Sequence, residues 1–127
     1  MIVDDRILVI FTDQYLRHAI SSILRSAWYT VALLDRVEDI GGEATIAMAL
    51  QKYSLLITDF ENVRSQNMVY FLRYKQRTVK PSIIVVVSQD EYSEAIGDDL
   101  IYNAVNHFIS VPFHPEEILA NAERYLG

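Results

Sequence analysis

Three hydrophobic runs in this chain end in polar residues, and a fourth ends in valine. The runs cover 7–11, 55–58, 83–87 and 107–110, and they are followed by Thr12-Asp13, Asp59, Ser88 and Val111. The carboxyl ends of parallel strands meet at one edge of a sheet, where α/β folds place their chemistry. We therefore expect an acidic cleft at this edge, to which the fourth run contributes no positively charged side chain.

Segments of helical periodicity alternate with these runs, which indicates βαβ units. A second strand is expected at 29–34, and helices are expected near 16–27, 43–52, 68–72, 92–100 and 115–126. The third and fourth strands are apolar on both faces, as a sheet covered on both sides requires. Right-handed crossovers then favour an α/β, flavodoxin-like (βα)5 fold. Its doubly wound parallel sheet would have five strands in the order 2-1-3-4-5, within a single domain covering 1–127.

Composition excludes several functions. The chain has no cysteine, which excludes thiol catalysis and disulfides. Its formal net charge of −6 repels phosphate backbones, so direct binding of nucleic acid by this chain is not expected. No apolar run approaches the length of a membrane span, and the first six residues lack the pattern of a signal peptide. We expect a cytoplasmic protein with no membrane partner.

The chain resembles the receiver domain of two-component response regulators over nearly its whole length. The resemblance is strongest in 7–13, 55–59 and 107–119. It implies that Asp59 corresponds to the aspartate that accepts a phosphoryl group from a histidine kinase. It further implies that Asp13 corresponds to one acid of a Mg²⁺-binding pair, Ser88 to a phosphoryl ligand and Phe108 to an aromatic switch residue. The Val111-Pro112 bond matches one that the family holds in cis.

Two replacements depart from the family pattern. Thr12 stands where the family has the first acid of the pair, and Val111 stands where it has a lysine. Phosphoryl transfer depends on positioning and on charge neutralisation, so the loss of a fixed ammonium should weaken it. Mg²⁺ binding through Asp13, Asp59 and the backbone carbonyl of Glu61 is expected to be weak, because Mg²⁺ favours carboxylates in octahedral geometry.

Each candidate residue also has a structural alternative. Asp59 could cap local backbone, Asp13 could be the N-cap of the first helix, and Ser88 could be a turn or N-cap residue. Phe108 could be a fixed aromatic residue that does not move. The sequence leaves these alternatives open.

The first functional hypothesis is an atypical receiver that acts in signal transduction or transcription regulation through protein contacts, with absent or weak phosphorylation of Asp59. It would bind a protein partner or a second copy through its fourth helix, fifth strand and fifth helix. The interface residues expected on that face are Tyr92, Tyr102, Phe108 and Ile109. Such a domain is not an enzyme beyond weak autophosphorylation and autodephosphorylation. It would act alone or belong to a longer regulator.

The alternative is a conventional Mg²⁺-dependent receiver that a histidine kinase phosphorylates on Asp59. A third possibility is an unrelated flavodoxin-like protein that binds a small ligand.

Overall fold

The computed structural model describes residues 6–126 and contains a five-stranded parallel sheet in the order β2-β1-β3-β4-β5. Every neighbouring pair of strands is parallel, and Ile10 of β1 lies opposite both Leu34 of β2 and Thr58 of β3. The predicted fold and strand order are confirmed. The strands are β1 (Ile7–Ile10), β2 (Val31–Leu34), β3 (Leu55–Asp59), β4 (Ser82–Val87) and β5 (His107–Ser110).

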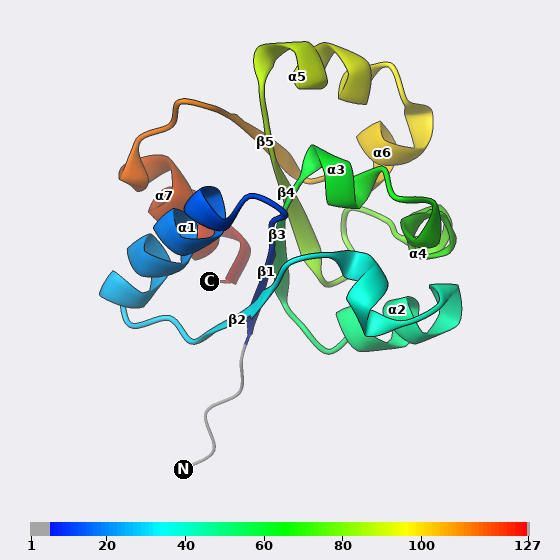
Figure 1. The fold of residues 1–127 in the computed structure, drawn as a ribbon, viewed down its shortest axis with the longest axis horizontal. Helices are drawn as coiled ribbons and strands as arrows, with labels where there is room; N and C mark the ends of the chain where they lie inside the picture. The colour runs from blue at the N-terminus through cyan, green and yellow to red at the C-terminus, as the bar shows by residue number, and fades with distance from the viewer. Residues whose placement is uncertain (1–5, 127) are drawn as a thin grey trace.

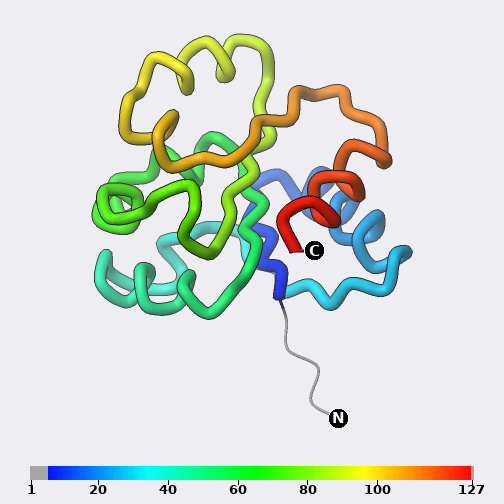
Figure 2. The backbone as a smooth tube through the Cα atoms, turned by 180° about the vertical axis from the view of Figure 1, so that it is seen from behind, coloured from blue at the N-terminus to red at the C-terminus, as the bar shows by residue number. Residues whose placement is uncertain are grey.

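Helices cover both faces of the sheet (Figures 1 and 2). One face carries α1 (Gln14–Ser26) and α7 (Pro115–Leu126), which contact each other. The other carries α2 (Glu43–Leu50), α4 (Val69–Tyr74) and α6 (Asp99–Ala104), with α5 (Gln89–Ile96) beyond the carboxyl end of β4. Three short helical segments complete the chain: η1 (Val37–Ile40), α3 (Phe60–Val63) and η2 (Gln66–Met68).

The sheet separates two hydrophobic clusters because successive side chains of a strand point to opposite faces. Leu8, Leu56 and Val85 belong to the cluster beneath α2 and α4. Val9 and Ile57 belong to the cluster beneath α1 and α7. All six residues of β4 are buried, which explains why positions 83–87 are all apolar in the sequence.

The strict alternation of five strands with five helices is wrong in detail. The helix expected over 92–100 ends at Ile96, and α6 begins after Asp98. The Asp98 side chain accepts a hydrogen bond from the backbone N–H of Ile101, so it caps a new helix. The helix expected near 68–72 is likewise divided, since Met68 ends η2 and α4 begins at Val69. The expected cis Val111-Pro112 bond is confirmed, and Lys80-Pro81 is also cis.

No helix within residues 6–126 combines the length and apolar character needed to cross a bilayer.

Lys75, which directly follows α4, is buried and has an unusual titration. Only 6% of the surface of Lys75 is exposed to solvent. Desolvation, with a smaller contribution from the charge of Lys80, lowers the pKa of Lys75 from 10.5 to about 8. Between these two values the unfolded chain binds more protons than the folded protein, so this group makes stability rise with pH across that window.

Replacing Lys75 with methionine should therefore stabilise the protein below pH 8. The expected gain in the free energy of unfolding is about 1–3 kcal/mol, because methionine keeps the apolar stem and removes the buried charge. The gain should shrink as the pH rises from 8 to 10.5, since the wild-type amine is then already neutral in the folded state. Denaturant unfolding of the wild type and of Lys75→Met at pH 8 and at pH 10.5 measures this gain in the free energy of unfolding. A difference that does not change with pH would contradict the assignment.

Candidate functional site

The carboxyl ends of β1, β3 and β4 surround a pocket of about 310 Å³. The parallel arrangement brings Asp13 and Asp59 to the same edge of the sheet, as the sequence predicted, although they are 46 positions apart. Ser88 and Val111 reach the same pocket from the ends of β4 and β5. The pocket is lined by Thr12, Asp13, Leu16, Asp59, Glu61, Val86, Val87, Ser88, Glu91 and Val111.

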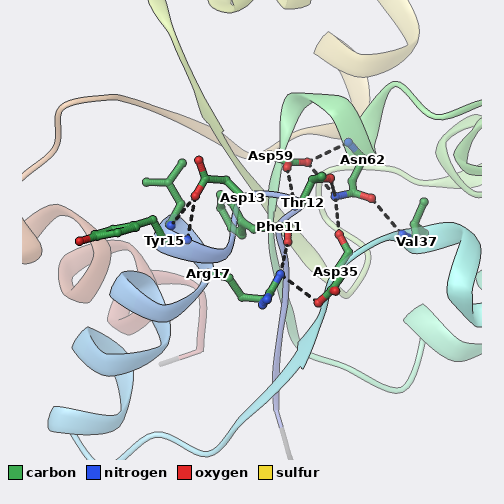
Figure 3. A network of polar contacts seen from close by, with 10 residues as sticks. Phe11, Thr12, Asp13, Tyr15, Arg17, Asp35, Val37, Asp59 and Asn62 are labelled. Atoms are coloured by element: carbon green, nitrogen blue, oxygen red, sulfur yellow. Dashed lines mark hydrogen bonds and ion pairs between the residues drawn. The ribbon is translucent and has the colours of Figure 1, made fainter.

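The carboxylate of Asp59 is held by three N–H donors of this chain (Figure 3). The backbone N–H of Thr12 donates to Oδ2 at 2.9 Å. The backbone N–H and the side-chain Nδ2 of Asn62 both donate to Oδ1, each at 2.8 Å. Asp59 is thereby the N-cap of α3, with both oxygens engaged.

Asn62 connects Asp59 to the end of β2. Its side chain is buried, and its amide oxygen accepts a hydrogen bond from the backbone N–H of Val37 at 2.9 Å. Its Nδ2 also donates to the carbonyl of Asp35 at 3.3 Å. Figure 3 shows this amide lying between Asp59 and Val37. Sequence reasoning missed Asn62, and the only local signal was an amide three residues after the strand-end aspartate.

Asp13 and Ser88 both serve as helix caps. Oδ1 of Asp13 accepts hydrogen bonds from the backbone N–H groups of Tyr15 and Leu16, at 2.8 and 3.2 Å. Ser88 Oγ accepts from the Glu91 N–H at 3.2 Å, and the Glu91 carboxylate accepts from the Ser88 N–H at 2.9 Å. The capping alternatives for these residues are therefore confirmed. Metal or phosphoryl binding by either residue stays a prediction.

The pocket carries negative charge without a facing cation. Its lining includes four carboxylate residues, Asp13, Asp59, Glu61 and Glu91, and neither lysine nor arginine. Val111, which is 36% exposed, occupies the end of β5.

Arg17 lies near the end of β1, but its guanidinium is already engaged. Its Nη1 donates to the carbonyl of Phe11 at 2.8 Å and pairs with the Asp35 carboxylate at 2.9 Å. Arg17 therefore anchors α1 to the ends of β1 and β2, and its charge is matched by Asp35.

The hydrogen bonds to Asp59 restrict how its carboxylate could bind Mg²⁺. Mg²⁺ needs carboxylate or carbonyl oxygens with free lone pairs in octahedral geometry. Asp59 Oδ1 accepts two N–H donors from Asn62, whereas Oδ2 accepts one from Thr12 and keeps a second lone pair. Within residues 6–126, no group of three or more His, Cys, Asp or Glu side chains is placed to hold a metal ion. Mg²⁺ would therefore bind Asp59 at Oδ2, because at Oδ1 it would have to displace an Asn62 donor.

The predicted interface residues divide into exposed and buried ones. Tyr92 and Tyr102 are 40% and 46% exposed. Phe108 is half-buried, and its ring meets that of Tyr92 edge to face with centroids 5.6 Å apart. Ile109 is buried beneath α7, so the prediction that it contacts a partner is wrong. The alternation of β5 turns Ile109 inward and leaves its neighbours closer to the surface.

No family model and no curated protein sequence matches this chain. Solved structures do match it. A response regulator receiver domain protein (CheY-like) from Methanospirillum hungatei has 15% identity and a TM-score of 0.64, over 96% of this chain and 93% of that one. A protein assigned as a response regulator from Chloroflexus aurantiacus has 20% identity and a TM-score of 0.71, over 97% and 98%.

NtrX from Brucella abortus matches with 18% identity and a TM-score of 0.68 over 94% of this chain. This chain spans only 25% of the length of that protein. At these identities the agreement concerns the path of the backbone, and it extends over nearly the whole chain in each case. The chain therefore has the fold of the response regulator receiver domains.

Proposed function

We propose that this chain is an atypical receiver domain that acts in signal transduction through protein contacts, with absent or weak phosphorylation of Asp59. The observation that carries the proposal is the state of the Asp59 carboxylate, which accepts three N–H donors and faces no cation in its pocket. A conventional acceptor needs a free carboxylate oxygen for attack and positive charge to neutralise the incoming phosphoryl group. Here the Asp59 oxygens accept hydrogen bonds that cap α3 and link it to the end of β1.

This proposal gives the domain a binding role, with no turnover beyond at most weak phosphorylation and dephosphorylation of itself. Protein partners suit a chain with a net charge of −6 better than nucleic acid does. We assign it to the cytoplasm, as a single domain covering 1–127.

Intact-mass measurement after incubation with acetyl phosphate and Mg²⁺ tests the proposal. We expect no gain of a phosphoryl group, or only a trace, because Asn62 engages Oδ1, the Thr12 N–H stabilises the charge of Oδ2, and no cation of the pocket lining neutralises the phosphoryl group. Asp59→Asn is the matched control, since it keeps the size of the side chain and removes the acceptor. A gain close to one phosphoryl group per chain that disappears in Asp59→Asn would contradict the proposal.

That contradictory result would establish the alternative, a conventional receiver phosphorylated by a histidine kinase. One observation favours this alternative. Asp13, Asp59 and Ser88 line the same pocket, which is the arrangement that the chemistry requires. In that case the metal would bind Oδ2 beside the Thr12 N–H, or displace the Asn62 amide from Oδ1.

The surface proposed for contact is formed by α5, α6, β5 and α7. Tyr102 is its most exposed aromatic residue among those predicted, and Arg77 lies over its ring at 5.0 Å from the centroid. Tyrosine and arginine side chains often contribute a large part of the binding energy of a protein interface. We infer that this surface, which we call the tyrosine face, joins two copies of the chain or docks another protein.

Tyr102→Glu should weaken self-association, because it places a carboxylate on the tyrosine face. Sedimentation velocity should show a shift from dimer towards monomer. This corresponds to an increase of about tenfold or more in the dissociation constant of the dimer. Tyr15→Glu is the control, since Tyr15 is 89% exposed on α1 and lies outside this face. A wild-type protein that remains monomeric, or equal effects of the two substitutions, would count against a homodimer through this face.

A further inference from the structure

A second pocket lies between α2 and α4, at the end of the sheet opposite the Asp59 pocket. It has a volume of about 370 Å³ and shares no lining residue with the Asp59 pocket. Figures 1 and 2 both show α2 and α4 next to each other. The segment between α4 and β4 contributes part of the lining. Its lining consists of Ala47, Gln51, Tyr70, Phe71, Tyr74, Lys75, Val79 and Lys80.

Lys75 brings a buried positive charge to this pocket without a carboxylate partner. The residue is only 6% exposed, and its Nζ donates to the carbonyl of Gln76. The ion pairs found within residues 6–126 are Arg17–Asp35 and Arg64–Glu94, and neither involves Lys75. Two further donor positions of the ammonium remain for a ligand. A buried charge without a counter-ion is unfavourable, and a bound anion would remove that penalty.

Two lysines line the pocket, and Lys75 is the buried one. Lys80 also lines the pocket, but its Nζ donates to the carbonyl of Tyr125 at the end of α7. No aspartate or glutamate lines the pocket. A single buried ammonium suits a single negative charge, whereas a phosphate group is usually bound by several N–H or guanidinium donors.

The other walls of the pocket are apolar and aromatic. The rings of Tyr70 and Tyr74 lie 5.1 Å apart, and the two residues are 45% and 73% exposed. Phe71, Ala47 and Val79 contribute apolar surface, and Gln51 contributes an amide. Small-molecule sites commonly combine such walls with a few polar groups and have volumes of a few hundred Å³. Aromatic walls favour a flat ligand that can pack against the rings.

We propose that this pocket binds a small carboxylic acid with a flat apolar body. The Lys75 ammonium pairs with the carboxylate, and Tyr70 and Tyr74 cover the body. The site goes beyond the signalling function proposed for Asp59 and depends on none of its residues. A result that rejects the Asp59 proposal therefore does not affect the proposal for the Lys75 pocket, and the reverse also holds.

Titration with 2-naphthoate, followed by ¹H–¹⁵N NMR of the full chain, tests the proposal. We expect saturable shifts at the amides of α2, of α4 and of the segment around Lys75. 2-Naphthamide has the same shape without the charge, and it should bind about tenfold more weakly because the charge-assisted hydrogen bond is lost. Lys75→Met should weaken binding of 2-naphthoate by a similar factor.

Lys52→Met is the matched control, because Lys52 is exposed just after α2 and does not line the pocket. It should bind 2-naphthoate as the wild type does. The comparison of naphthoate with naphthamide on the wild-type protein decides the question without relying on any variant. Absence of shifts at millimolar 2-naphthoate, shifts confined to another surface, or equal binding of acid and amide would each overturn the proposal.

Discussion

Replacing Asn62 with alanine is expected to lower the free energy of unfolding by about 2–4 kcal/mol, the largest effect of any single polar substitution in the site. The substitution removes the acceptor for the Val37 N–H, and Val37 is fully buried. It also removes the amide that donates to the Asp59 carboxylate and to the Asp35 carbonyl. A buried donor left without a partner costs more than the hydrogen bond itself contributed. Chemical denaturation of the two proteins measures the difference.

Asn103→Ala provides the matched control for this loss. Asn103 is exposed on α6, so its replacement should change the free energy of unfolding by no more than about 0.5 kcal/mol. If both substitutions had equal effects, the Asn62 side chain would not be joining β1, β2 and α3 as its contacts indicate.

Introducing lysine at Val111 is expected to produce the largest gain of phosphorylation. Val111 lines the Asp59 pocket, which contains four carboxylate residues and no cation. A pair of opposite charges about 4 Å apart is worth ~4 kcal/mol at an effective dielectric constant near 20. Because Val111 is partly exposed, we expect only a fraction of this, which corresponds to a rise of about tenfold in the rate of Asp59 phosphorylation by acetyl phosphate.

Val79→Lys adds the same charge outside the Asp59 pocket and should leave the rate unchanged. Quantitative intact-mass time courses of the wild type and both variants provide the comparison. An unchanged rate in Val111→Lys would show that the missing ammonium is not what limits the site. The hydrogen bonds from Asn62 would then be the dominant restraint.

The arrangement of the strands was predictable because it depends on local patterns. The run 83–87 is apolar at every position, which only a strand covered on both faces requires, and β4 is buried along its whole length. Once the strands are parallel and the order is 2-1-3-4-5, Asp13 and Asp59 must come to one edge. The pocket confirms this placement.

The partners of the side chains were not predictable in the same way. Asn62 reaches Val37, which lies 25 positions earlier in the chain, and no local pattern in either segment indicates that contact. The burial of Lys75 depends on the packing of α2 against α4, which a helical period alone does not specify. For Ile109, the register of β5 decides which residues face inward, and a short strand of mixed residues leaves that choice open.

The most direct test of the central claim is the ¹H–¹⁵N NMR signal of the Asn62 side-chain amide during a titration with Mg²⁺. The claim is that this amide, rather than a metal ion, holds the Asp59 carboxylate. We predict that its two protons exchange slowly with solvent and that millimolar Mg²⁺ leaves them and the Thr12 and Asn62 backbone amides unshifted. A saturable movement of these three signals, lost in Asp59→Asn, would contradict the account.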